Sequence, residues 1–552
     1  MVCGTTSDAG KSHVVTGLCR LLARRGVRVA PFKAQNMALN SYVTPSGHEI
    51  GRAQGVQALA AGVEPDVAMN PILLKPTGER TSQVVVLGRA IGHLDAAAYH
   101  EAKPALLATV LDALADLRAR FDVVICEGAG SPAEVNLLDH DIVNLRIAHE
   151  AGLPSVVVGD IDRGGVFAAL YGTVTLLPDH LRAHVRGFII NKFRGDPALL
   201  DGGLADLERR CGVPTLGVVP WLPDVALDAE DSLALDGRRP RAPGPAVADT
   251  VDVAVVRLPR ISNFTDLDAL AVEPGVAVRL VTDAGALGDP DLIVLPGTKT
   301  TVADLEWLRG NGLDRAVRAA ADRLGGGSLV LGICGGFQMM GNTLDDDVES
   351  RRGRVEGLGW LDVSTVFEPV KTTRQRRGRA LGQRVTGYEI HHGSVGRGPG
   401  ARPWVDLDDV HGMAAEGAGD PACGPYVGTN LHGLLEADGV RAAFLSAVAS
   451  RRGKRWVPAG ASFTAAREAQ WDRLADALEA HVDVAALEGL ISSAGAPARR
   501  PPPAPPIAHP PIAHPPIAPP VAPPAIARPA VTPRPATAGG PPLDIGPAGV
   551  GR

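Results

Sequence analysis

The segment Ser328-Leu-Val-Leu-Gly-Ile-Cys334-Gly-Gly-Phe-Gln-Met-Met340 decides how the second half of this chain must fold. Its apolar start favours a strand, and the frame Gly332-Ile-Cys334-Gly-Gly336 turns sharply into a predicted helix. The glycines let a substrate approach the backbone. The helix N-terminus favours thiolate over thiol, and its free N–H groups, including that of Gly335, can bind a developing oxyanion. The pattern predicts a cysteine nucleophile at Cys334, with a buried cysteine at a tight turn as the alternative.

The length and composition of the chain limit the number of domains and the class of protein that it can be. A chain of 552 residues is too long for one hydrophobic core, so two or three domains are expected. A hydrophobic content of 45%, 21% charged residues and a net charge of -6 are ordinary for a globular protein and give no indication of nucleic-acid binding. The six cysteines are scattered without a CxxC pair, which favours a reducing compartment over disulfides or a zinc site. No apolar run approaches a membrane span, so we expect a cytoplasmic protein without a membrane partner.

The first residues predict a phosphate-binding loop. They are Met1-Val-Cys-Gly4-Thr-Thr6-Ser-Asp-Ala-Gly10-Lys11-Ser12, followed by an amphipathic segment from His13 to Arg25. A glycine-rich turn between strand and helix cradles phosphates with its N–H groups, while the lysine reaches the terminal phosphates and the serine hydroxyl binds magnesium. We therefore expect ATP at Thr6, Gly10, Lys11 and Ser12. The spacing from Gly4 to Gly10 is one residue longer than usual, which indicates a variant loop.

Polar residues follow several predicted strands of the first half. The strands cover residues 27–33, 121–126, 154–160 and 187–193 and alternate with helical segments, which predicts a parallel sheet covered on both faces. Ligands of such sheets bind beyond the carboxyl ends of the strands, where Lys33, Glu127 and Asn191 stand. Glu127 at the tip of a buried strand is suited to hold Mg²⁺ directly or through water, with a solvated or capping glutamate as the alternative.

The first half resembles the synthetase half of the cobyric acid synthase family. The matching segments are Gly4–Ser12, Pro31-Phe-Lys-Ala-Gln-Asn-Met37, Glu127-Gly-Ala-Gly-Ser-Pro132, Asp160-Ile-Asp-Arg-Gly-Gly165 and Asn191-Lys-Phe-Arg-Gly195. That family is similar in fold to dethiobiotin synthetase, whose ATPase domain activates a carboxylate by phosphorylation. The resemblance implies that Lys11 and Ser12 contact ATP and Mg²⁺ and that Glu127 is a direct or second-sphere metal ligand. It further implies that Asn191 contacts the adenine edge and that Lys33 lies near the transferred phosphate.

A second set of motifs surrounds Cys334. The segment Asp291-Leu-Ile-Val-Leu-Pro-Gly297-Thr-Lys-Thr300 is a predicted strand that runs into a glycine turn, and it can supply a second oxyanion N–H near Gly297. The segment Gly428-Thr-Asn-Leu-His432-Gly433 carries a histidine, and a cysteine nucleophile needs such a base. Spacing alone leaves His391, His392 and His411 as competitors of His432.

The segments Gly332–Gln338, Gly387-Tyr-Glu-Ile-His-His-Gly393 and Asn430–Gly433 resemble the triad-type glutamine amidotransferase domain of the cobyric acid and cobyrinic acid diamide synthases. The resemblance implies that Cys334 attacks the glutamine side-chain amide and that His432 activates the thiol. The wider class orients its histidine with a glutamate two residues later, where this chain has Leu434, and the nearest acid is Glu436. We therefore expect a Cys-His dyad.

The predicted organisation is an ATP-binding synthetase domain at 1–222, a linker at 223–249 and an amidotransferase domain at 250–450. A helical segment at 451–496 and a disordered proline-rich tail at 497–552 follow, since the tail lacks the apolar residues for a core. The stretch Leu258-Pro-Arg260-Ile-Ser-Asn263-Phe-Thr-Asp266 also resembles the family, and its Arg260 and Asn263 are expected at the domain interface or in a solvated loop.

Together the halves predict an amide-forming ligase that uses ATP and glutamine. By resemblance its substrate is a corrinoid, adenosylcobyrinic acid a,c-diamide, which is amidated at four peripheral carboxylates (b, d, e and g). The nearest alternative is a related amidotransferase-ligase, such as the a,c-diamide synthase or a cell-wall lipid amidating enzyme. A partitioning-type ATPase that works as a nucleotide-switched binding module is an alternative of another class, although such proteins carry a lysine where this chain has Thr5.

Overall fold

The computed structural model describes residues 1–78, 81–223, 225, 249–323, 326–410 and 412–494. All of these described residues fall within one compact unit. The predicted tail at 497–552 and nearly all of the predicted linker lie outside the described residues.

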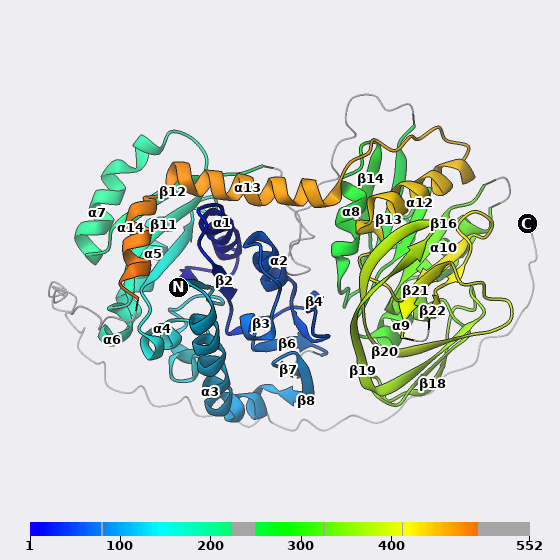
Figure 1. Cartoon of the computed structure of the whole chain (residues 1–552), viewed down its shortest axis with the longest axis horizontal. Helices are drawn as coiled ribbons and strands as arrows, with labels where there is room; N and C mark the ends of the chain where they lie inside the picture. The colour runs from blue at the N-terminus through cyan, green and yellow to red at the C-terminus, as the bar shows by residue number, and fades with distance from the viewer. Residues whose placement is uncertain (79–80, 224, 226–248, 324–325, 411, 495–552) are drawn as a thin grey trace, which may run out of the picture. The chain divides into compact units, whose positions relative to one another are not determined.

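The first half is an α/β fold around parallel strands, as predicted (Figure 1). Four parallel strands pair in the order β1-β10-β11-β12, and β2 pairs with β9. A parallel bridge between Val2 and Glu127 joins the two groups, so their carboxyl ends meet at one edge. The strands are β1 (Val2–Gly4), β2 (Val29–Phe32), β9 (Val123–Cys126), β10 (Ser155–Asp160), β11 (Val185–Phe193) and β12 (Thr215–Pro220).

Helices pack around these strands because each presents an apolar face. In α1, for example, Val14, Val15, Leu18 and Leu22 are buried. The helices are α1 (Lys11–Arg24), α3 (Ala96–Arg120), α4 (Leu145–Ala151), α5 (Val166–Leu176), α6 (Asp179–Arg182) and α7 (Asp201–Cys211).

An insertion between β2 and β9 was not anticipated from the sequence. It contains helix α2 (Arg52–Ala60), a two-stranded hairpin and a four-stranded sheet. The hairpin strands are β4 (Ser41–Val43) and β5 (Glu49–Gly51), and the sheet is formed by β3 (Gln35–Met37), β6 (Ile72–Pro76), β7 (Thr81–Val86) and β8 (Arg89–Asp95). Strand β4 contacts the second half: Gln375 Nε2 donates to the carbonyl of Val43 (2.9 Å), and Val43 packs against Tyr388 and Ile390.

The second half is built on a six-stranded sheet of order β14-β13-β15-β16-β24-β23, which is parallel except for β23. Its central strands are fully apolar and buried, as a parallel sheet covered on both faces requires. The strands are β13 (Val251–Val256), β14 (Val276–Val281), β15 (Leu292–Leu295), β16 (Leu329–Ile333), β23 (Ala418–Gly419) and β24 (Tyr426–Thr429). The helices are α8 (Asp268–Ala271), α9 (Thr301–Gly310), α10 (Leu313–Ala321), α11 (Gly335–Met339) and α12 (Asp438–Arg451).

A second sheet in this half is dominated by the long antiparallel hairpin β19–β20. Its strands are β17 (Thr343–Asp346), β18 (Gly353–Glu356), β19 (Val363–Ala380), β20 (Gln383–Arg397), β21 (Val405–Asp409) and β22 (Gly412–Glu416).

Two helices, α13 (Phe463–His481) and α14 (Val484–Ser492), end the described chain. Phe463 packs into the core of the second half, whereas Leu478 packs into the core around α1. Ion pairs support the second contact, with Arg20 Nε 2.8 Å from Asp472 and Arg24 Nη1 2.6 Å from Asp476. A single helix thus contributes to the cores of both halves.

Candidate active sites

The predicted phosphate loop lies between β1 and α1, at the common carboxyl edge of the strands. Lys11 is buried, and its Nζ donates to the carbonyls of Thr6 (2.9 Å), Ser7 (3.2 Å) and Gly130 (3.2 Å). The amine is therefore held over the loop by backbone oxygens. Thr6 is exposed at the tip of the loop.

Gly10 and Asn191 fix the shape of this loop. Gly10 has φ +98°, which favours glycine, and a Cβ there would lie 2.0 Å from Asn191 Nδ2. Asn191, near the end of β11, donates from Nδ2 to the carbonyl of Ala9 (3.0 Å). Asn191, which the sequence predicts to contact adenine, thus also holds the phosphate loop through the Ala9 carbonyl.

Glu127 is the centre of a buried polar cluster. Its Oε1 accepts hydrogen bonds from Ser12 Oγ (2.9 Å) and Lys33 Nζ (2.9 Å), and its Oε2 accepts one from Gln57 Nε2 (2.6 Å). Burial alone raises the pKa of Glu127, but the Lys33 charge and the hydrogen bonds outweigh it and hold this pKa below its ordinary value. The predicted metal ligands Ser12 and Glu127 and the predicted phosphate-site Lys33 are therefore brought together, with the carboxylate ionised.

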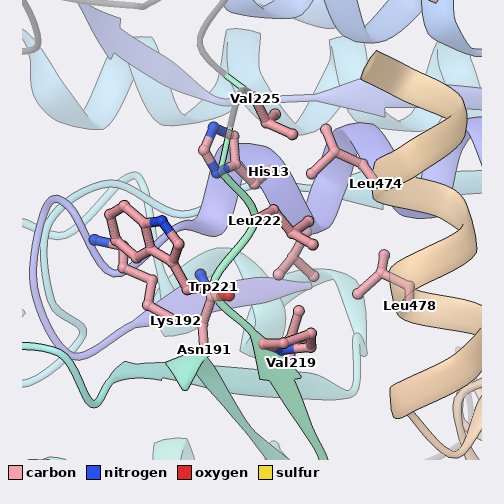
Figure 2. Close-up of a pocket in the computed structure, with 11 residues that line it drawn as sticks. His13, Asn191, Lys192, Val219, Trp221, Leu222, Val225, Leu474 and Leu478 are labelled. Carbon is pink, nitrogen blue, oxygen red and sulfur yellow. The ribbon is translucent and has the colours of Figure 1, made fainter. Parts of the chain in front are cut away.

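A pocket opens beside the loop, and Figure 2 shows the side chains that line it. His13, Asn191, Lys192 and Trp221 line it together with Leu474 and Leu478 of α13. Lys192 Nζ is held by the Asp8 carbonyl (2.7 Å) and by Asp160 Oδ2 (2.8 Å). The pocket combines an aromatic ring, an amide and apolar side chains next to the phosphate loop, which is typical of small-molecule sites.

Cys334 stands at the predicted strand-to-helix turn between β16 and α11. Its backbone has φ +51° and ψ -112°, and its N–H donates to the carbonyl of Thr429 (2.8 Å). Such a backbone is strained for any residue except glycine. Gly336 permits the turn, because a Cβ there would lie 2.0 Å from the carbonyl oxygen of Leu295. The sulfur lies 3.9 Å from the carbonyl oxygen of Ile390, and Cys334 lines a pocket.

His432 is fully buried next to Cys334. Its backbone pairs with that of Tyr388 through two hydrogen bonds, and the Tyr388 ring stacks on the imidazole with centroids 5.2 Å apart. Burial lowers the pKa of His432, but the adjacent Asp266 carboxylate and the interaction with Cys334 outweigh burial and raise this pKa to about 10. The protonated imidazole is thus stabilised beside the sulfur.

A third residue, Asp266, lies beside this pair, whereas the sequence led us to expect a Cys-His dyad. His432 Nδ1 lies 2.7 Å from Asp266 Oδ2, while Asp266 Oδ1 accepts the Gly433 N–H (2.7 Å). Glu436, the nearest acid in the chain, instead pairs with Arg52 (3.2 Å) and Arg467 (3.3 Å). Asp266 lies 166 residues before the histidine, on the short helix Phe264–Leu267. Its only sequence signal was its place in the family-like stretch 258–266.

The predicted oxyanion loops meet at the cysteine turn. A Cβ on Gly335 would lie 3.1 Å from the backbone nitrogen of Thr298, and a Cβ on Gly297 would lie 3.1 Å from His432 Cε1. The loop after β15 therefore lies close to both the start of α11 and the imidazole.

The competing histidines occupy other positions. His391 lines the Cys334 pocket, but its Nε2 lies 3.6 Å from Glu389 Oε1, and neither ring nitrogen makes a hydrogen bond within the described structure. His392 contacts the carbonyl of Glu368 through Nδ1 (2.9 Å). His411 lies outside the described residues. Of the described candidates, His432 is the histidine that interacts with both Cys334 and a carboxylate in the manner of a nucleophile–base–acid group.

Two family models match the chain, one in each half. Residues 1–234 match the family model of the CobQ/CobB/MinD/ParA nucleotide binding domain, and residues 252–440 match that of the CobB/CobQ-like glutamine amidotransferase domain. Among solved structures, PurLQS from Thermotoga maritima is 18% identical with a TM-score of 0.27 and covers 36% of this chain and 98% of its own, too weak a likeness for any argument.

Curated relatives match over nearly their whole length. A cobyric acid synthase of Rhodococcus jostii is 55% identical over 501 residues, which cover 90% of this chain and 96% of the relative. One of Streptomyces avermitilis is 53% identical over 514 residues, covering 92% and 99%. One of Saccharopolyspora erythraea is 55% identical over 506 residues, covering 91% and 96%.

A nucleotide-binding half joined to a glutamine amidotransferase half defines the class of glutamine-dependent amide-forming ligases. Within that class, the chain belongs to the cobyric acid synthase family. Among the described residues, no helix combines the length and the apolar character that crossing a membrane requires.

Proposed function

We propose that this enzyme makes adenosylcobyric acid in cobalamin biosynthesis, in the cytoplasm. It uses ATP and glutamine to amidate the b, d, e and g carboxylates of adenosylcobyrinic acid a,c-diamide. The observation that carries the proposal is the Cys334–His432–Asp266 group in a chain that also holds a phosphate loop and matches cobyric acid synthases almost end to end. The net charge of -6 gives no indication of a nucleic-acid partner.

Glutamine hydrolysis begins with transfer of the Cys334 thiol proton to His432 Nε2. Asp266 accepts the Nδ1 hydrogen, which fixes the tautomer and stabilises the imidazolium. The thiolate attacks the side-chain amide carbon of glutamine, and backbone N–H groups near Gly297 and Gly335 stabilise the oxyanion. His432 then returns the proton to the leaving nitrogen, which departs as ammonia. Water hydrolyses the remaining glutamyl thioester to glutamate.

The first site fits a nucleoside triphosphate with Mg²⁺. A glycine-rich turn whose Gly10 has a positive φ, a buried amine at Lys11, and the hydroxyl and carboxylate oxygens of Ser12 and Glu127 support this assignment. Thr6 at the tip of the loop completes the phosphate side. Asn191 is proposed to contact the base, which would lie in the pocket of Figure 2. ATP supplies the phosphoryl group that converts a substrate carboxylate oxygen into a leaving group.

Lys33 is proposed to neutralise charge on the acyl phosphate as ammonia attacks the carbonyl carbon and phosphate leaves. The ion pair of Lys33 with Glu127 supports this role, because it orients a buried amine at the edge where Lys11 also lies. Ammonia and the acyl phosphate are both lost to water if exposed, so the proposal includes an enclosed passage between the sites.

The test replaces Cys334 with Ala and supplies glutamine or an ammonium salt as nitrogen source. We expect glutamine-dependent amidation of the a,c-diamide to be lost and ammonia-dependent amidation to be kept, as measured by chromatography of the corrinoid products. Wild-type enzyme is assayed in parallel on cobyrinic acid and on a cell-wall lipid acceptor. Survival of the glutamine-dependent reaction in the variant, or preference of the wild type for either other acceptor, contradicts the proposal.

A further inference from the structure

Asn263 lies between the histidine of the second half and the β4 strand of the first. It is buried, with 4% of its surface exposed, and lines the Cys334 pocket. Its backbone has φ +51°, in the left-handed region that asparagine tolerates better than most residues. The proposed mechanism assigns it no role.

The orientation of its amide group is set by the first half. Asn263 Oδ1 accepts the backbone N–H of Ser41 at 2.8 Å. Because a backbone N–H can only donate, the oxygen must face Ser41 and the amino group must face the other way. That amino nitrogen, Nδ2, lies 3.4 Å from His432 Nε2.

This contact bears on the proton that the reaction moves. Nδ1 of His432 is engaged by Asp266, so Nε2 is the nitrogen that receives the thiol proton. An amide NH₂ group donates and does not accept, so it is compatible with an Nε2 that carries a free lone pair. Once Nε2 is protonated, two donors face each other. Asn263 in this orientation therefore offsets part of the stabilisation that Asp266 and Cys334 give the imidazolium, and to that extent it opposes formation of the thiolate–imidazolium pair.

Further contacts tie β4 to the same histidine. Tyr388, which stacks on His432, donates from its hydroxyl to the carbonyl of Ser41 (3.4 Å). Ser41 is itself anchored, because its hydroxyl donates to Glu49 (2.6 Å). Glu49 forms buried ion pairs with Lys75 of the first half (2.5 Å) and Lys371 of the second (2.7 Å). A shift of this strand in the first half would therefore reach the imidazole through Asn263.

We infer that Asn263 is a positioning residue that restrains glutamine hydrolysis until the first half is loaded. While Ser41 holds its carbonyl, the amino group disfavours the reactive form of His432. Displacement of β4 frees the amide to turn its oxygen toward the protonated Nε2. This inference rests on the proposed function and adds to it the residue that links the two reactions.

The test measures glutaminase activity with and without ATP plus the corrinoid acceptor. Asn263→Gly removes the amide and suits the left-handed backbone. We expect the basal glutaminase rate to rise about fivefold, which corresponds to about 1 kcal/mol, and its stimulation to fall by a similar factor. Ammonia-dependent synthesis stays at the wild-type rate. Asn263→Asp keeps an oxygen toward Ser41 and places a second one toward Nε2, so its basal rate rises at least as much.

Asn342→Gly serves as the matched control, because Asn342 is an exposed asparagine of the same half whose amide contacts Asp362. It should leave basal rate and stimulation unchanged. A lower basal rate in Asn263→Gly with the same stimulation ratio overturns the inference, as does a parallel loss of melting temperature and ammonia-dependent synthesis, which marks a structural role. An unstimulated wild-type glutaminase also overturns it. By contrast, a wild type that makes no amide from glutamine at all rejects the proposed function itself.

Discussion

The two candidate sites are held together by different means. In the first half, charged and polar side chains hold one another, with Ser12, Lys33 and Gln57 all bound to Glu127. In the second half, the backbone sets the geometry. Cys334 sits on a strained turn, and His432 is fixed by paired backbone hydrogen bonds to Tyr388.

This difference follows from what each site must do. A phosphoryl transfer site works by positioning several charged groups around an anionic ligand, so a small displacement of one group can be compensated by its neighbours. A cysteine nucleophile must meet its base and the oxyanion donors within a few tenths of an ångström, and rigid elements provide that better than side chains. Substitutions in the first site should therefore reduce synthesis from both glutamine and ammonia. Substitutions in the second site should reduce only the glutamine-dependent reaction.

The largest effect is expected for Lys11→Ala. Loss of the buried amine removes charge from the phosphate site, so synthesis should fall at least about 10³-fold with glutamine and with ammonium salt alike. Product formation from each nitrogen source measures this. A variant that keeps ammonia-dependent synthesis would break the proposed division between the sites.

A smaller and one-sided effect is expected for Asp266→Asn. The amide cannot stabilise the imidazolium, so the glutaminase kcat should fall about 10²-fold, less than in serine triads because a thiol is the stronger acid. Ammonia-dependent synthesis should be unchanged. Glu436→Gln is the matched control, since it changes the nearest acid in the chain, which pairs with Arg52 and Arg467 instead. If Glu436→Gln loses the glutaminase and Asp266→Asn keeps it, the assigned third residue is wrong.

The smallest effect concerns Glu416, which supports the segment before His432. Its carboxylate accepts the Asn430 N–H (2.7 Å) and the Thr429 hydroxyl (2.5 Å). Burial raises the pKa of Glu416 to about 7 from an ordinary 4.5. The folded state thus binds more protons than the unfolded state between these values, and stability falls as pH rises through that window. Glu416→Gln should remove this loss and raise the melting temperature at about pH 8 but hardly at about pH 4.

Glu389 provides a control for that experiment, because its pKa is shifted in the opposite direction to that of Glu416. Although burial raises its pKa, contacts with His391 and Arg374 outweigh burial and lower this pKa to about 2. The ionised carboxylate therefore stabilises the fold above the ordinary pKa, and Glu389→Gln should lower the melting temperature at neutral pH. Equal shifts in both variants would contradict the pH argument.

The sequence predicted those parts of the sites that are local in the chain. The phosphate loop and the cysteine turn are each a strand, a glycine-rich bend and a helix start, so their residues already carry the geometry. The α/β fold was predicted for the same reason, and the predicted strands agree with the observed ones to within about two residues.

The rest depends on tertiary contacts between distant segments. Asp266 reaches His432 across 166 residues, and Asn263 reaches Ser41 across 222. No spacing rule connects such pairs, because packing alone determines which loop meets which strand. The insertion with β4 and the dual packing of α13 were unseen for the same reason. The strands of the insertion are short and α13 is an amphipathic helix, and neither pattern indicates which distant segment it packs against.

The strained backbone at Cys334 places a requirement of catalysis in conflict with the thermal stability of the fold. A side chain at φ +51° and ψ -112° costs roughly 1–3 kcal/mol of conformational strain, which glycine avoids. The residue whose sulfur the reaction needs therefore occupies a position that folding alone would assign to the smallest amino acid. A screen of this chain for heat resistance alone should therefore select Cys334→Gly, a variant that is more stable but inactive. The same substitution relieves the backbone strain and removes the sulfur that glutamine hydrolysis needs.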